Sequence, residues 1–103
     1  MALRLDSANS EIETLFQLAG DLQGKSVLEV GCGDGRLTWG YGHRPALVYA
    51  VDPNEVKIAA AKRTLPPQWY GRVQFAAQSL EQYYAAAIQT PTRYDIAIFS
   101  WSL

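Results

Sequence analysis

Three glycines at alternate positions follow a short apolar run in the first third of the chain. The run is residues 26–30, and the glycines are Gly31, Gly33 and Gly35. Glycine lacks a Cβ atom, so it adopts backbone dihedrals that other residues avoid and lets the main chain approach a ligand closely. A strand-to-helix turn can need one glycine for packing alone, but three glycines directly after a buried strand favour a ligand-binding loop.

The rest of the chain alternates β-rich runs with helical stretches. We expect strands at 26–30, 47–51, 73–76 and 95–99, and helices at 10–18, 35–41, 54–65 and 80–88. The strand runs are continuously apolar, which fits strands that are covered by helices on both faces. This order predicts one α/β domain over residues 1–103, a Rossmann-like, partly parallel open sheet of about four strands flanked by helices.

The segments that follow the expected strands are small, polar or acidic. They are residues 31–35, 52–53, 77–79 and 100–102. Parallel strands deliver their carboxyl ends to one edge of the sheet, where ligands bind in folds of this kind. We therefore expect a glycine loop, an acidic residue, a polar turn and an aromatic corner to converge there.

The spacing of the glycines restricts the type of ligand. The dinucleotide fingerprint needs G-x-G-x-x-G, but here the third glycine comes one residue early and Arg36 stands in its place. Glu29 and Asp34 would repel a pyrophosphate and suit a ligand with positive charge. A Walker loop is excluded because no Gly-Lys-Ser/Thr follows. The loop therefore favours a cationic nucleoside.

Asp52 ends the second expected strand, about 20 residues after the glycine loop. A carboxylate in that place can accept hydrogen bonds from both hydroxyls of a ribose. Asp52 could instead cap the helix that follows. Asn54 can do that, so we favour the ribose role for Asp52.

Three segments resemble class I S-adenosylmethionine-dependent methyltransferases. Residues 27–35 look like motif I of that family, residues 48–52 like the segment with its ribose-binding acid, and residues 94–103 like its fourth strand and the corner after it. Motif I is the most specific of the three. The resemblance implies S-adenosylmethionine as the cofactor.

By this resemblance, the main chain at Gly31 and Gly33 would border the methionine moiety, and Glu29 would position its amino end. Asp52 would hold the ribose, and residues 53–54 would lie beside the adenine. The family often has an acidic residue that binds the adenine amino group where this chain has a serine. The cofactor-binding residues so implied are Glu29, Gly31, Cys32, Gly33, Gly35, Asp52, Pro53, Ser79, Leu80 and Ser100.

No residue is assigned a catalytic role. Methyl transfer from a sulfonium needs chiefly alignment and the exclusion of water, although an acceptor of high pKa also needs a general base. His43 follows the helix that leads away from the glycine loop, so we expect it at the opposite edge. Trp101 could line an acceptor pocket or pack the strand end. Tyr83 and Tyr84 fit helix packing better than a stacking platform.

Composition narrows the function classes further. Cys32 is the only cysteine, which excludes an intrachain disulfide and argues against a cysteine-based metal site; we expect no metal. Nine Lys and Arg against ten Asp and Glu leave no basic excess to drive nucleic-acid binding. The chain shows neither a signal-peptide core nor a membrane-spanning stretch. We expect a cytoplasmic protein whose acceptor is a small molecule.

The chain stops at Leu103, directly after the fourth expected strand, whereas members of the family continue. We therefore expect the donor-binding portion of a methyltransferase, incomplete at its C-terminus. A non-catalytic S-adenosylmethionine-binding or partner-stabilised module is the first alternative. An NAD-binding domain is the second, and the glycine spacing and Asp34 disfavour it. The fourth strand is expected to form an exposed apolar edge that allows self-association.

Overall fold

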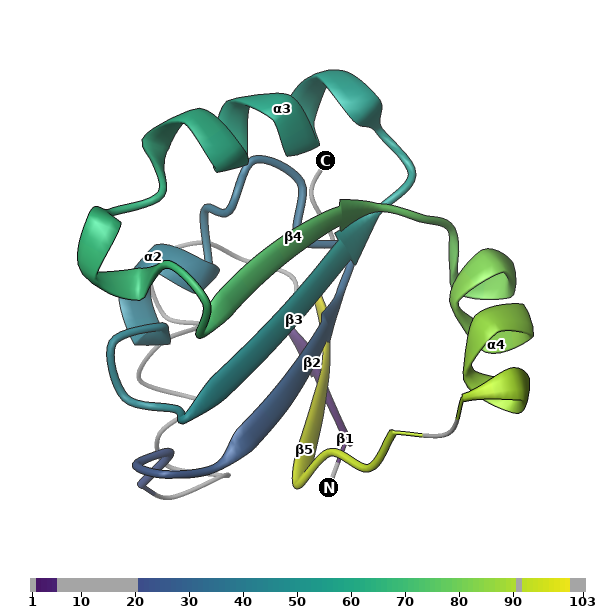
Figure 1. Ribbon diagram of the computed structural model, residues 1–103, viewed down its shortest axis with the longest axis horizontal. Helices are drawn as coiled ribbons and strands as arrows, with labels where there is room; N and C mark the ends of the chain where they lie inside the picture. The colour runs from purple at the N-terminus through teal and green to yellow at the C-terminus, as the bar shows by residue number, and fades with distance from the viewer. Residues whose placement is uncertain (1, 6–20, 91, 101–103) are drawn as a thin grey trace.

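The computed structural model describes residues 2–5, 21–90 and 92–100. Within them, one sheet holds strands in the order β1-β5-β2-β3-β4, and every pairing is parallel. The strands are β1 (Ala2–Leu5), β2 (Ser26–Val30), β3 (Leu47–Asp52), β4 (Val73–Ala77) and β5 (Ile96–Ser100). The helices are α2 (Thr38–Tyr41), α3 (Glu55–Thr64), α4 (Leu80–Gln89) and a short 3₁₀ helix (Pro67–Trp69). Figure 1 shows α2 and α3 on one face of the sheet and α4 on the other.

The predicted fold class is confirmed, with two corrections. The helix expected at 35–41 begins only at Thr38, because the glycine loop continues as turns up to residue 37. The fourth predicted strand, now β5, is not an exposed edge. β1 pairs with it on one side and β2 on the other, as in the register Leu5↔Ser100 and Val30↔Phe99. The helix expected at 10–18 and Trp101 lie outside the described residues.

The apolar core lies between the sheet and the helices α2 and α3. Alternate strand residues face it, and the larger members of this core are Val27, Val48, Val73, Phe75, Ile96, Ile98, Leu37, Tyr41, Ile58 and Trp69. Removal of this apolar surface from water is the main force that holds the helices on the sheet. The opposite face is covered less completely, because no residue of α4 is fully buried.

Local signals in the sequence fix where α3 begins and ends. The Asn54 side chain accepts a hydrogen bond from the main-chain N–H of Lys57 at 3.0 Å, so Asn54 caps the helix as expected. Proline at positions 66 and 67 prevents the helix from continuing. Because α3 begins three residues after β3 ends, its amino end lies beside the carboxyl end of that strand. None of the described helices is long and apolar enough to cross a membrane.

Candidate functional site

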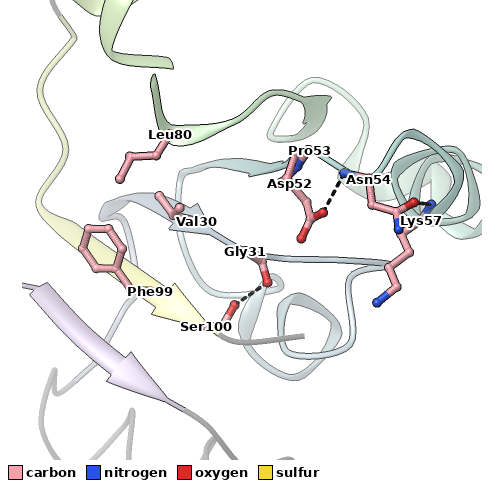
Figure 2. A pocket seen from close by; sticks show the side chains of 9 residues that line it. All are labelled: Val30, Gly31, Asp52, Pro53, Asn54, Lys57, Leu80, Phe99 and Ser100. Atoms are coloured by element: carbon pink, nitrogen blue, oxygen red, sulfur yellow. Dashed lines mark hydrogen bonds between the residues drawn. The ribbon is translucent and has the colours of Figure 1, made fainter. Parts of the chain in front are cut away.

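A cavity of about 410 Å³ opens at the carboxyl ends of the strands. It is lined by Val30, Gly31, Asp52, Pro53, Asn54, Lys57, Leu80, Phe99 and Ser100. Figure 2 shows that its two sides differ in chemistry. The apolar side chains of Val30, Leu80 and Phe99 gather on one side, and Asp52, with the amino end of α3, lies on the other. A ligand with an apolar part and a polar part would fit this arrangement.

The glycine loop forms the floor of the cavity at Gly31. This residue has a φ of +87°, and a Cβ atom there would overlap the main-chain carbonyl oxygen of Ser100. Its N–H donates to the carbonyl oxygen of Val51 at 2.8 Å. Gly31 thus lies against β5 and is tied to β3, so only glycine allows the main chain to pass between these two strands.

Asp52 joins the glycine loop to α3. The side chain is 6% exposed, and its Oδ2 accepts a hydrogen bond from the N–H of Gly33 at 3.0 Å. Its Oδ1 accepts from the N–H of Asn54 at 2.8 Å. Asp52 also lines the cavity, so its carboxylate lies where hydroxyl groups of a ligand could donate to it.

Glu29 is fully buried beneath the loop and points away from the cavity. The hydroxyls of Thr38 and Tyr41 donate to its Oε1 at 2.6 and 2.7 Å, and the hydroxyl of Ser100 lies 2.9 Å from its Oε2. Burial raises the pKa of this carboxyl, and the three hydroxyl hydrogen bonds oppose that shift. The Ser100 hydroxyl also lies 3.0 Å from the carbonyl oxygen of Gly31.

The segment that contains the glycine loop and Asp52 also matches a known protein family in sequence. The family model described as a methyltransferase domain matches residues 27–103. The chain belongs to the methyltransferase-domain family. This confirms the resemblance inferred from the glycine loop.

The names of curated relatives of this methyltransferase domain point to different methyl acceptors. Over 59 residues it is 44% identical to a ribosomal RNA small subunit methyltransferase C from Chromohalobacter salexigens, covering 57% of this chain and 18% of the relative. Over 84 residues it is 32% identical to a mitochondrial ubiquinone biosynthesis O-methyltransferase from Schizosaccharomyces pombe, covering 80% of this chain and 29% of the relative. The chain thus spans less than a third of either relative.

Among solved structures, the methyltransferase domain is similar to the magnesium protoporphyrin IX methyltransferase from Synechocystis PCC 6803 with S-adenosylmethionine bound. The TM-score is 0.64 at 28% sequence identity, and the match covers 89% of this chain and 41% of that one. The likeness extends over nearly the whole chain, so it supports the predicted fold as well as the family.

The structure brings half of the predicted cofactor residues to the cavity. Those that line it are Gly31, Asp52, Pro53, Leu80 and Ser100. Those that do not are Glu29, Cys32, Gly33, Gly35 and Ser79. The first four of these are buried, Glu29 beneath the glycine loop and the other three within it, and the fifth caps the start of α4. Contact of any of them with a cofactor stays a prediction.

Three lining residues were not predicted as site residues. Val30 and Phe99 come at the ends of β2 and β5, and strand alternation places them on the face opposite Glu29 and Ile98. Lys57 lies three residues after the cap of α3. The period of two along each strand was the available signal for the first two. The helix start at Asn54 was the signal for the third.

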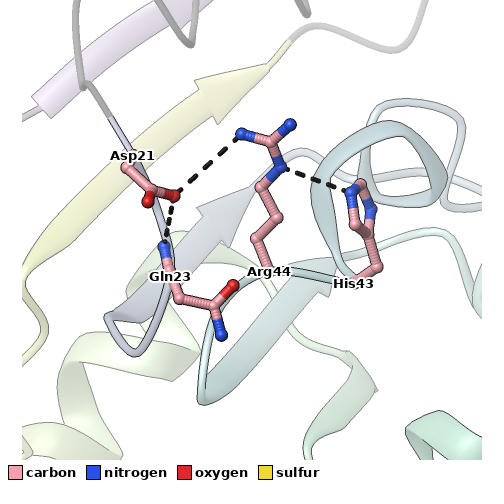
Figure 3. A network of polar contacts seen from close by, with 4 residues as sticks. All are labelled: Asp21, Gln23, His43 and Arg44. Atoms are coloured by element: carbon pink, nitrogen blue, oxygen red, sulfur yellow. Dashed lines mark hydrogen bonds and ion pairs between the residues drawn. The ribbon is translucent and has the colours of Figure 1, made fainter.

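His43 lies at the opposite edge of the sheet, as expected. Figure 3 shows it beside Arg44, whose Nε donates to the His43 Nε2 at 3.3 Å. Arg44 also forms an ion pair with Asp21 at 4.0 Å, and its carbonyl oxygen accepts from the N–H of Gly24 just before β2. His43 therefore belongs to a surface network at the amino ends of the strands.

The other residues considered in the sequence, Cys32, Ser79, Tyr83 and Tyr84, are placed as follows by burial, capping and packing. Burial raises the pKa of the Cys32 thiol, which disfavours the thiolate that a nucleophile needs. Ser79 caps α4 through a reciprocal pair of hydrogen bonds with Gln82. The Tyr83 ring lies 6.1 Å from that of Tyr49 on the sheet, whereas Tyr84 is 61% exposed. In the described part of the chain, no cluster of His, Cys, Asp or Glu could hold a metal ion.

Proposed function

We propose that this methyltransferase domain binds S-adenosylmethionine in the cavity and belongs to an enzyme that transfers the methyl group to a small molecule. The observation that carries the proposal is the meeting of the glycine loop and Asp52 at one cavity of about 410 Å³, in a chain of this family. The similar solved structure that holds S-adenosylmethionine supports the choice of cofactor.

The two sides of the cavity suit the two ends of a nucleoside. Asp52 would accept the ribose hydroxyls, and Val30, Leu80 and Phe99 would enclose the adenine. The main chain at Gly31 would border the methionine part. S-adenosylmethionine supplies a methyl group already activated by the sulfonium, so the residues of this chain serve to bind and orient it.

The small-molecule acceptor is proposed on charge. Lys and Arg number nine against ten Asp and Glu, so the chain offers no net positive charge to attract a phosphate backbone. The relatives include an RNA methyltransferase by name as well as an O-methyltransferase of ubiquinone biosynthesis. An assay of methyl transfer to RNA and to phenolic small molecules would separate the two acceptor classes.

Calorimetric titration tests the cofactor. We expect saturable binding of S-adenosylmethionine and none of NAD. Asp52→Asn removes the charge of a hydrogen-bonding carboxylate and should weaken binding by about 1–3 kcal/mol. Asp21→Asn, a matched change in the exposed ion pair at the opposite edge, should leave the affinity unchanged. Saturable NAD binding without a response to S-adenosylmethionine would overturn the proposal.

A further inference from the structure

Neither acidic residue of the motif I segment, Glu29 or Asp34, lines the cavity, and of the two only Glu29 is buried. On β2 it alternates with Val30, and Val30 is the residue that lines the cavity. Glu29 is 0% exposed and faces α2, where Thr38 and Tyr41 are equally buried. Its Oε1 already receives two hydroxyl hydrogen bonds, at 2.6 and 2.7 Å.

Ser100 connects this buried carboxylate to the floor of the cavity. Its hydroxyl carries a single proton but lies within hydrogen-bond distance of two acceptors, the Oε2 of Glu29 at 2.9 Å and the carbonyl oxygen of Gly31 at 3.0 Å. Gly31 in turn lies so close to the Ser100 backbone that no Cβ would fit between them. A shift of Glu29 would therefore be expected to move both Ser100 and Gly31.

We propose that Glu29 is a positioning residue, which holds Ser100 and Gly31 in place through its hydrogen bonds to α2 and β5 and does not contact the donor. The proposal rests on the proposed function, because it concerns the donor cavity. It differs from what the resemblance to the family implies, in which Glu29 positions the amino end of the methionine moiety. The cause of the difference is the pair of hydroxyls supplied by Thr38 and Tyr41.

The variant Glu29→Gln separates positioning from direct contact. The Gln oxygen can accept from Thr38 and Tyr41, and its amide N–H can donate to Ser100, which then donates to Gly31. The shape of the network is kept while the charge is lost. We expect the affinity for S-adenosylmethionine to change by less than about threefold, whereas loss of a direct carboxylate–ammonium contact would cost about tenfold or more. A tenfold loss would overturn the proposal.

Tyr41→Phe and Glu29→Ala complete the comparison. Tyr41 is fully buried on the α2 side and does not line the cavity, so we expect no contact between its hydroxyl and the donor. We expect Tyr41→Phe to weaken donor binding by about three- to tenfold, at a temperature where the variant is fully folded. Glu29→Ala should weaken it more, and Glu29→Gln should restore it. An unchanged affinity in Tyr41→Phe would show a purely structural role and contradict positioning.

Amide spectra of the ligand-free chain keep this test separate from the proposed function. Tyr41→Phe should shift the N–H resonances of Gly31 and Ser100, to which the described hydrogen bonds connect Tyr41 through Glu29, and leave that of Gly24 at the opposite edge in place. If the wild-type chain bound no S-adenosylmethionine, the proposed function would fail, yet these shifts would still be measurable. Unshifted Gly31 and Ser100 resonances would overturn the positioning role by themselves.

Discussion

At the scale of single residues, Gly31 shows how a missing Cβ atom decides the shape of the site. Gly31→Ala would combine a positive φ with an overlap against the carbonyl oxygen of Ser100. We expect a loss of at least about 2 kcal/mol in the free energy of unfolding. Gly24→Ala is the matched control, because its φ is +75° but nothing lies within 4 Å of the added Cβ. Chemical denaturation of both variants should show the larger loss for Gly31→Ala, and equal losses would exclude the overlap.

The carboxyl groups of Glu29 and Asp95 should change the stability of the fold in opposite directions as the pH changes. Burial raises the pKa of Glu29 above its usual 4.5, so its contribution is complete below about that pH and is lost as the pH rises through the pKa of the folded state. Glu29→Gln should therefore gain stability relative to the wild type as the pH rises from about 4 to about 8. Urea unfolding at several pH values measures this difference. A difference that stays flat with pH would contradict the raised pKa.

Asp95 supplies the control of opposite sign. Hydrogen bonds from the main-chain N–H and hydroxyl of Ser26 lower the pKa of its carboxyl below the usual 3.8. Its contribution is present above that pH and is lost as the pH falls through the pKa of the folded state. Asp95→Asn should therefore be less stable than the wild type near neutral pH, and this difference should shrink as the pH falls through the pKa of the folded state. The same urea series measures it, and a difference that stays constant with pH would contradict the lowered pKa.

The residues of the site were predictable to different degrees. The glycine loop and Asp52 are visible in the sequence because chain order alone places both at the carboxyl ends of neighbouring strands. The burial of Glu29 is not visible, because it depends on Thr38, Tyr41 and Ser100, which are 9, 12 and 71 residues away. Such pairings arise only when α2 and β5 pack against β2.

At the scale of elements, α4 depends on its cap more than on its packing. None of its residues is fully buried, and Ser79 and Gln82 form a capping box at its start. We expect Ser79→Ala to destabilise α4 by about 1 kcal/mol and Ser79→Asp to preserve it, since aspartate caps equally well. Hydrogen exchange of the α4 amides measures the effect, with those of α3 as the internal reference. Unaltered α4 protection in Ser79→Ala would show that packing holds the helix.

Four strands could be read from apolar runs, but β1 could not. The run Ala2–Leu5 has only four residues, and its partner is the segment at residues 97–100. A parallel pairing across almost the whole chain leaves no local signal. The start of α2 was misjudged because the turns of the glycine loop, between β2 and α2, take up residues 33–37.

At the scale of the whole molecule, β1 decides which strands are edges. It covers β5, so β1 and β4 flank the sheet in the part of the chain that is described. Removing residues 1–5 would expose the unpaired main chain of β5, an apolar strand. We expect the shortened chain to self-associate and to unfold more easily than the full chain in sedimentation and denaturation experiments. A shortened chain that stays monomeric and equally stable would show that β1 adds little to the sheet.

We propose that the carboxyl edge of this sheet binds S-adenosylmethionine. The most direct test is a titration of the isotope-labelled chain with S-adenosylmethionine, followed through its amide resonances. We expect saturable shifts at Gly31, Asn54 and Leu80, which line the cavity, and none at His43 on the opposite edge. No shift at the cavity residues, or shifts confined to the region of His43, would contradict it.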